Sequence, residues 1–286
     1  MQLTVRGATQ ADRQQLANLI HFEVYVHRHL DWRPALEWLG HKPYLIAETR
    51  DEIQGVLACP LESPEIAWIR LFAARANLPL QEVWQALWSS ARDELSRSGQ
   101  TQAAAIVMQS WFKSLLEASG FEHSDDIVVL LWERGAGRTA PLPKKVAIRA
   151  MLPEDLEAVY QLDYLAFEVE WRNSANALAL AYQQSSLASV VEQAGTLIGY
   201  QISTTSLAGG HLARLAVHPG VRNQGIGYAL VDHLLQEMQQ RGIDQVTVNT
   251  QENNLASLAL YARAGFKQIE EQYQVYQFFL SSQGCQ

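Results

Sequence analysis

The sequence predicts an α+β fold of two related domains, each a mainly antiparallel sheet with helices on its faces. Two observations lead to this class. Short apolar segments with strand character outnumber the amphipathic helical segments and alternate with them along the chain. The chain has 286 residues, too many for one small core, and its second half repeats the first. We therefore expect domains at residues 1–134 and 146–286, joined by a linker at 135–145.

The repeat consists of three matches in the same order. Segments of the first half have counterparts 143 to 145 residues further along: Thr4–Leu19 with Ala147–Leu162, Arg70–Ala74 with Arg214–His218, and Leu115–Phe121 with Leu260–Phe266. This nearly constant offset is about half of the chain length and indicates two related domains. Between them, "ERGAGRTAPLPKK" (Glu133–Lys145) has two glycines, two prolines and five charges, which is typical of a linker.

The second half begins with strand, helix and hairpin patterns. "VAIRA" from Val146 predicts a short strand. "PEDLEAVYQLDYLAF" predicts a helix, because Pro153 suits a first turn and the acids lie at the positive end of the helix dipole. "LASVVEQAGTLIGYQISTT" predicts two strands joined at Ala194-Gly195. "GGHLARLAVHP" predicts another strand, which Pro219 ends.

The rest of the second half predicts two helices and two strands. In "GIGYALVDHLLQEMQQRG", apolar residues recur every four positions from Ile226 to Met238, so an amphipathic helix should run to Gly242. "DQVTVNTQ" predicts a buried strand. "NLASLALYARAG" predicts a helix from the N-cap Asn254 to the stop Gly265, and "QYQVYQFFL" a final strand.

Composition limits the function classes. Hydrophobic residues make up 48% and charged residues 18%, and no apolar run is long enough to span a membrane. The N-terminal sequence has no signal or transit pattern, so we expect a cytoplasmic protein without a membrane partner. A formal net charge of −8 without a basic stripe argues against a nucleic-acid partner. The two cysteines, Cys59 and Cys285, and the eight histidines show no metal-ligand spacing, so we expect no metal.

One loop suggests an anion site. A strand ending at His218 is followed by Arg222-x-x-Gly225-x-Gly227 and then by a helix. The first amides of a helix lack intrahelical partners and bind anions, and the bare glycines and the arginine favour a phosphate there. The loop lacks the Gly-Lys-Ser/Thr of a P-loop and the spacing of a dinucleotide fingerprint. A glycine-containing helix start with a solvated arginine is the alternative.

In its context, the loop resembles the GNAT superfamily of acyl-CoA-dependent N-acetyltransferases. Four features occur in that family's order: "LAVHP", "RNQGIG", Asn254, and "LYARAGF" a few residues later. The resemblance covers residues 146–280 well and residues 3–132 only in outline. It implies that acetyl-CoA is the co-substrate.

The resemblance also implies roles for individual residues. The backbone of Leu215, Ala216 and Val217 would pair with the pantetheine arm, and the Val217 amide would stabilise the oxyanion. Asn254 would bond the arm, and Tyr261 would act as general acid toward the thiolate, a transfer uphill by about 2 kcal/mol at ordinary pKa values. A core tyrosine is the alternative for Tyr261. The pyrophosphate would lie on the amides of Arg222, Asn223, Gln224, Gly225, Ile226 and Gly227.

The acceptor side is less defined. The strand "HLARLAVHP" has no acid to serve as the base for an ammonium substrate, although many relatives use a glutamate there. Glu168 and Glu170 in "FEVEW" are the candidates, with Trp171 as an apolar wall, and two surface acids are the alternative. The segment from Ala166 to Gln184 lacks strong helix or strand boundaries and is interpreted as an acceptor lip. His211, His218 and His233 are interpreted as surface or strand-end residues.

The first half has lost the anion loop. Leu78, Gln81 and Val83 stand where the second half has Arg222, Gly225 and Gly227, and Leu116 stands opposite Tyr261. We expect a degenerate copy that does not bind the cofactor. Its aromatic residues either fill its own core or form a surface for packing against the other domain: Trp84, Leu87, Trp88, Trp111 and Phe112.

The sequence as a whole predicts transfer of an acetyl group from acetyl-CoA to a primary amine by direct attack, carried out by the second domain. The acceptor is a small-molecule or peptide amine, and an oligomer is possible. A non-catalytic acyl-CoA-binding module and a dimerising scaffold are the alternatives. They differ in an assay, because the module binds the cofactor without turnover and the scaffold does not bind it.

Overall fold

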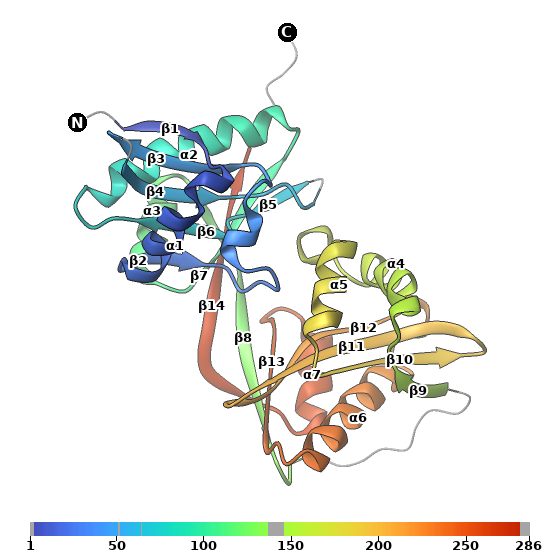
Figure 1. Ribbon diagram of the computed structural model, residues 1–286. Helices are drawn as coiled ribbons and strands as arrows, with labels where there is room; N and C mark the ends of the chain where they lie inside the picture. The colour runs from blue at the N-terminus through green and yellow to red at the C-terminus, as the bar shows by residue number, and fades with distance from the viewer. Residues whose placement is uncertain (1–2, 51, 64, 137–145, 281–286) are drawn as a thin grey trace. The chain divides into compact units, whose positions relative to one another are not determined.

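The computed structural model describes residues 3–50, 52–63, 65–136 and 146–280 (Figure 1). Most of the expected linker, and also Cys285, lie outside these residues. The chain divides into two compact units, one formed by Met1–Ser124 with Tyr273–Gln286 and the other by Asp125–Gln272. Strands and helices mix throughout both units, which confirms the α+β class.

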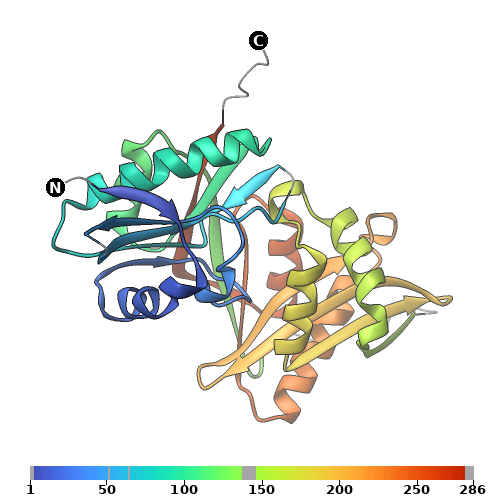
Figure 2. The same ribbon diagram turned by 45° about the horizontal axis from the view of Figure 1, so that its top comes forward.

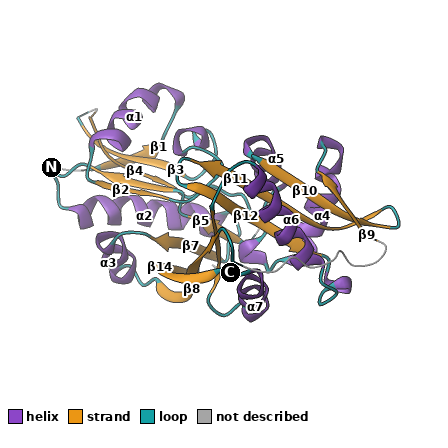
Figure 3. Cartoon of the chain, turned by 90° about the horizontal axis from the view of Figure 1, so that it is seen from below, coloured by secondary structure: helices purple, strands orange, loops and turns teal. Residues whose placement is uncertain are grey.

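The first unit contains a five-stranded antiparallel sheet (Figure 3). Its strands, in spatial order, are β1 (Thr4–Gly7), β3 (Tyr44–Thr49), β4 (Glu52–Ala58), β6 (Leu71–Ala74) and β2 (Tyr25–Arg28). Helix α1 (Arg13–Phe22), preceded by η1 (Gln10–Asp12), packs with η2 (Ala35–Trp38) on one face. Helix α2 (Leu80–Arg97) packs on the other face.

Three further strands complete the first unit. Strand β5 (Ile66–Trp68) runs parallel to β7 (Gln102–Val107), and β7 pairs antiparallel with the C-terminal part of β14 (Lys267–Phe279). Helix α3 (Ser110–Ala118) packs beside them.

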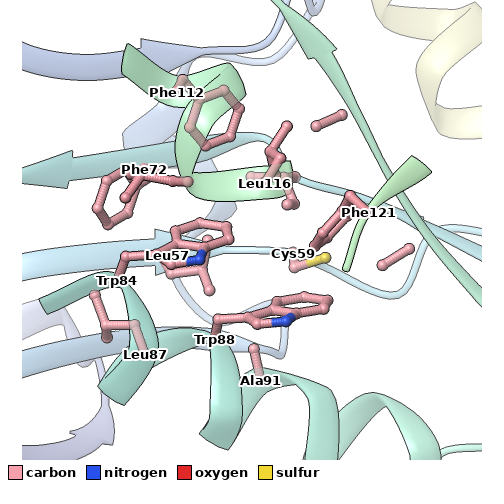
Figure 4. Packing of buried hydrophobic residues seen from close by; sticks show 14 of the residues in the cluster. Leu57, Cys59, Phe72, Trp84, Leu87, Trp88, Ala91, Phe112, Leu116 and Phe121 are labelled. Carbon is pink, nitrogen blue, oxygen red and sulfur yellow. The ribbon is translucent and has the colours of Figure 1, made fainter. Parts of the chain in front are cut away.

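Aromatic residues of α2 and α3 fill the core of the first unit (Figure 4). Trp84 and Phe112 have no exposed surface, and Trp88 is 4% exposed. The Phe72 ring contacts the Trp84 ring edge-on, with 5.0 Å between the two ring centres. Trp111 packs against the same cluster. Of the two interpretations of these aromatic residues, the core is therefore correct for the buried ones.

The second unit contains six consecutive strands of a nine-stranded sheet, with helices on both faces. Its strands, in spatial order, are β8 (Glu122–Glu133), β13 (Gln245–Gln251), β12 (Gly209–Val217), β11 (Thr196–Ser206), β10 (Leu187–Gln193) and β9 (Val146–Ala150). Only the β12–β13 pair is parallel among these neighbours. Figure 1 and Figure 2 show α4 (Leu156–Ala166) and α5 (Ala175–Gln184) on one face and α6 (Ile226–Gln240) on the other. Helix α7 (Leu255–Ala264) packs beside α6.

Most elements expected in the second half are present. The hairpin between β10 and β11 turns at Ala194 and Gly195, with φ of 50° and 79°. Helix α6 ends before Gly242, and Gly265 follows α7 in the left-handed conformation. The lip was incompletely predicted, because it contains the 3-10 helix η4 (Val169–Trp171) and the whole of α5. Ser174 caps α5 by accepting a hydrogen bond from Ala177 N at 3.1 Å, and serine is a residue type that favours this position.

The units differ from the two halves of the sequence at β8 and β14. Residues 127–133 of β8 pair with β13 of the second unit. Residues 274–279 of β14 pair with β7 of the first unit. Each half of the sequence thus supplies a strand to the unit formed mainly by the other half. No described helix is long and apolar enough to cross a membrane.

Candidate active site

A cavity of about 730 Å³ lies in the second unit where β12, α6, α7 and the lip meet. Most of the site residues predicted from the sequence line it: Glu168, Trp171, Leu215, Ala216, Val217, Arg222, Asn223, Gly225, Ile226, Gly227 and Asn254. Gln224, Glu170 and Tyr261 are not among the lining residues. Segments far apart in the sequence are therefore brought to one concave surface.

Strands β12 and β13 separate at the cavity. Their parallel pairing covers only Gly210–Leu212 with Val246–Val248. Beyond that point, Leu215 and Val217 of β12 and Gln251 of β13 line the cavity instead of facing each other across a ladder. Among the described residues, no strand pairs with this edge of β12, which leaves peptide groups available to an extended ligand.

The Val217 amide points toward this open edge. In an antiparallel pair, alternate residues direct their N–H and C=O groups at the partner strand. His218 N donates to Ile198 O of the β11 side at 2.9 Å, and Val217 lies opposite Gly199 in the same register. The Val217 and Leu215 amides accordingly face away from β11 and toward the cavity.

The loop before α6 presents bare amides. Asn223 and Gly225 have φ of 62° and 83°, so the chain turns sharply into the helix. The first helical bond runs from Ala229 N to Gly225 O at 3.0 Å. The amides of Ile226, Gly227 and Tyr228 precede it and lack intrahelical acceptors. Residues 222–225 are exposed, as an anion site requires.

The two glycines serve different purposes. Gly225 adopts a left-handed conformation that costs other residues about 1 kcal/mol. Gly227 allows close packing, since a Cβ there would lie 3.2 Å from Leu260 Cδ2 of α7 and 3.6 Å from Val217 Cγ2. From the sequence, access of a phosphate to the amides was the only reason for a glycine at either position. The close packing of α6 against α7 is a second reason for Gly227.

Two arginines line the cavity. The Arg222 guanidinium donates to the carbonyl oxygen of Ala166, the last residue of α4, at 2.8 Å. Arg263 of α7, which the sequence analysis did not select, stacks over the Tyr228 ring at 4.7 Å. Arg263 stands two residues after Tyr261 in the "LYARAGF" segment. The sequence therefore placed it near the site, but it did not show that its side chain lines the cavity.

Asn254 has a structural role as well as a place in the cavity wall. Its Oδ1 accepts a hydrogen bond from Ser257 N at 3.1 Å and caps α7. The cap was expected. It occupies Oδ1, so that the side-chain NH₂ is the group suited to donate to a ligand.

Tyr261 lies in the apolar core between α6, α7 and the sheet. It is 5% exposed, and its ring is 5.7 Å from that of Phe266. Burial raises the pKa of its hydroxyl above the usual value near 10. A higher pKa makes a weaker proton donor, so its predicted role as general acid is less favourable here than at an ordinary pKa.

A buried ion pair connects the lip to β12. Asp163 of α4 has no exposed surface and accepts hydrogen bonds from Arg214 Nε at 2.7 Å and Arg214 Nη2 at 2.8 Å. The Tyr200 hydroxyl and the Asn173 amide also donate to Asp163. Arg214 in turn donates to Trp171 O at 2.7 Å. Its guanidinium carbon lies 3.5 Å from the centre of the Phe167 ring.

This ion pair was not predicted from the sequence. Asp163 stands four residues after the buried Val159 and next to the buried Leu162, on the apolar side of α4. An acid on an apolar stripe is the signal that points to a buried partner.

The three histidines considered near the site do not line the cavity. His211 Nδ1 is 2.9 Å from Thr247 Oγ1, and burial lowers the pKa of its ring. His218 Nδ1 accepts from Gly220 N at 3.1 Å. His233 lies within α6. Asp125, which does line the cavity, was also missed.

Part of the second half of the chain is similar in sequence to known proteins. Residues 156–266 match the acetyltransferase (GNAT) family. The [ribosomal protein bS18]-alanine N-acetyltransferase of Escherichia coli (strain K12) is 29% identical over 121 residues, which are 42% of this chain and 80% of that protein.

Solved structures resemble the whole chain. A tandem GNAT protein from the clavulanic acid biosynthesis pathway is 15% identical, with a TM-score of 0.67 over 98% of this chain and 99% of its own. A GCN5-related N-acetyltransferase from Sphaerobacter thermophilus is 16% identical, with a TM-score of 0.63 over 97% and 96%. At these identities the likeness shows the fold, which is that of two GNAT domains in tandem.

Proposed function

Because residues 156–266 match the GNAT family of acetyltransferases and the chain has the fold of a tandem GNAT protein, we propose that the second unit transfers an acetyl group from acetyl-CoA to a primary amine. The observation that carries the proposal is the meeting of two features in one cavity. These are the open edge of β12 and the bare amides at the start of α6.

The residues present suit coenzyme A. Backbone groups of Leu215 and Val217 would pair with the amides of the pantetheine arm, as an added strand does. The amides of residues 222–227 and the Arg222 guanidinium would bind the pyrophosphate. The Asn254 NH₂ group would donate to the arm.

The reaction is a direct acyl transfer. The amine nitrogen forms a bond to the thioester carbonyl carbon, the carbon–sulfur bond breaks, and the products are an amide and free coenzyme A thiol. The Val217 amide is directed to stabilise the negative charge that develops on the carbonyl oxygen. An acceptor that arrives as an ammonium ion loses two protons in all. One goes to solvent or to Glu168 of the cavity lining before attack, and the second balances the proton that the thiolate gains.

The acceptor is proposed as an amine of a peptide or of a small molecule. A peptide N-terminus is included because a relative acts on the alanine of a ribosomal protein. Glu168 and Trp171 line the cavity, where a carboxylate and an aromatic ring suit a cationic amine. Glu170 is not part of the lining, so it is the weaker candidate of the two acids.

The test is thiol release from acetyl-CoA across a panel of amines, with calorimetry of coenzyme A binding beside it. The panel contains a peptide that begins with alanine, polyamines, aminoglycosides and free lysine. Thiol release that depends on one acceptor supports the proposal. Binding of coenzyme A without turnover on any amine supports a non-catalytic acyl-CoA-binding module, which the position of Tyr261 outside the cavity lining favours. No binding at all contradicts both.

A further inference from the structure

Both units have a similar segment after their first helix. The residues "FEV" occur at Phe22–Val24, beginning with the last residue of α1, and at Phe167–Val169, directly after α4. In the first unit the chain continues as strand β2. In the second unit it continues as η4 and forms part of the cavity wall. Related segments have thus taken different conformations.

The strand pairs beside these segments correspond in register. Ile66 of β5 pairs with Gln102 of β7, and Gly210 of β12 pairs with Val246 of β13. Each residue of the second pair stands 144 positions after its counterpart in the first pair. In each unit this parallel pairing covers three residues. The next residues of the first unit, in β6, thus correspond to the open edge of β12.

Strand β2 occupies that edge in the first unit. It pairs antiparallel with β6, from Tyr25 opposite Ala74 to Arg28 opposite Leu71. By the same offset, Leu71–Ala74 corresponds to residues 215–218. The first unit therefore has its own chain in the place that the acyl-CoA arm would take in the second.

Among the described residues of the first unit, no helix carboxylate pairs with the equivalent arginine. Arg70 corresponds to Arg214, but its guanidinium bonds Glu62 at 2.8 Å and lies 3.6 Å from Asp31, and both of these acids lie outside α1. The buried Ile20 of α1 stands where α4 has Asp163. An apolar side chain cannot hold an arginine, so the contact that joins helix, strand and lip in the second unit is lacking here.

We propose that Asp163 and Arg214 are positioning residues that hold the segment Phe167–Asn173 away from the open edge of β12. This edge then stays available to the pantetheine arm of acyl-CoA. The contacts act directly on that segment. Asp163 accepts from Asn173 N, while Arg214 donates to Trp171 O and lies against Phe167. The importance of the open edge for acyl-CoA binding rests on the proposed function, whereas the conformation of the segment does not.

The test uses the full chain with Asp163→Leu, which places an aliphatic side chain where the first unit has Ile20. Hydrogen exchange of the peptide containing residues 213–218 is measured without coenzyme A. Pairing of the lip with β12 would slow exchange of the Leu215 and Val217 amides, whereas simple loosening would speed it. We expect slower exchange and about tenfold weaker coenzyme A binding, because only a minor fraction of the molecules then has the edge of β12 unpaired.

Asp155→Leu is the matched control. Asp155 pairs with Arg149 at the start of α4, at 2.6 Å, and neither residue lines the cavity. It should not slow exchange at 213–218. Unchanged or faster exchange in Asp163→Leu overturns the proposal.

Should Asp163→Leu fail to fold, a triple variant that also carries Arg214→Leu and Tyr200→Phe replaces the whole network by apolar groups. The same slowing is expected of it, and its absence overturns the proposal. Failure of wild-type protein to bind coenzyme A would instead count against the proposed function, because the exchange measurement needs no ligand.

Discussion

The guanidinium of Arg222 is bonded to the carbonyl oxygen of Ala166, at the C-terminal end of α4. A cation is favourable at a helix C-terminus, where carbonyl groups have no intrahelical partner. The same cation stands beside the bare amides before α6, so one side chain reaches both the lip and the proposed phosphate site.

Arg222→Ala should weaken coenzyme A binding about fivefold, the scale of an exposed charged contact. The wild-type advantage should shrink in high salt, because an exposed pair is screened. Calorimetry at two salt concentrations measures both effects. Arg241→Ala is the control, since Arg241 follows the other end of α6 and bonds Ser186 O. Equal losses in the two variants would contradict a phosphate role for Arg222.

Gly225→Ala should reduce both stability and coenzyme A binding. The left-handed φ of 83° costs an alanine about 1 kcal/mol, and relaxing it would redirect the amides of the loop. Gly195→Ala is the control, because Gly195 has a φ of 79° in the β10–β11 turn and does not line the cavity. Thermal unfolding should show similar losses for both. Only Gly225→Ala should bind coenzyme A more weakly, and unchanged binding would remove the loop from the site.

Tyr261→Phe should slow turnover by less than about tenfold, because a buried hydroxyl with a raised pKa is a poor donor to a thiolate. The ratio of wild-type to variant kcat should stay constant between pH 6 and 9, since the tyrosine remains protonated there. Steady-state kinetics across that range measure it. Abolished turnover in a folded variant would show that Tyr261 matters more than its burial suggests.

His27 should make the first unit sensitive to acid. Its ring has no exposed surface and stacks on Phe112 at 4.0 Å, and burial lowers its pKa from 6.5 to about 4. The unfolded chain therefore binds more protons than the folded one between pH 6.5 and 4. Stability is fully present above pH 6.5 and falls by up to about 3 kcal/mol as the pH drops to 4.

Denaturant unfolding across this range measures the effect. His27→Phe should have a flatter profile, although not a flat one, because burial also lowers the pKa of His29. His21→Gln, on the exposed side of α1, should retain the wild-type slope. An unchanged slope in His27→Phe would contradict the assignment.

Coenzyme A should bind with a stoichiometry of one per chain. The edge of β6 in the first unit is paired with β2, and Leu78, Gln81 and Val83 replace the loop residues of the second unit. Titration calorimetry measures the stoichiometry. Two sites, or binding that survives in Gly225→Ala at full strength, would contradict it.

Local features of the fold were predictable from the residues themselves. Arg6 and Arg149, aligned by the repeat, form equivalent ion pairs with Asp12 and Asp155. The cap at Asn254 and the left-handed Gly265 are also where the sequence indicated. Caps, turns and helix stripes depend on neighbours a few residues apart, so the order of side chains is sufficient to predict them.

Long-range features were not predictable. Nothing in the strand patterns of β8 and β14 indicates that each pairs in the unit formed mainly by the other half, because a strand pattern identifies faces and not partners. The partner of Asp163 was hidden for the same reason, since Arg214 is 51 residues away.

The sequence by itself determined the repeat, the α+β class, the loop at 222–227 and the absence of that loop from the first half. The folded chain was needed to show that β12 and β13 separate, that the loop and the strand edge meet in one cavity, and that "FEV" leads into a strand in one unit and a 3-10 helix in the other. The physical reason is that a segment's conformation, when its own residues leave it open, follows from the contacts that distant parts of the chain offer. Here the decisive contact in the second unit is the buried carboxylate of Asp163.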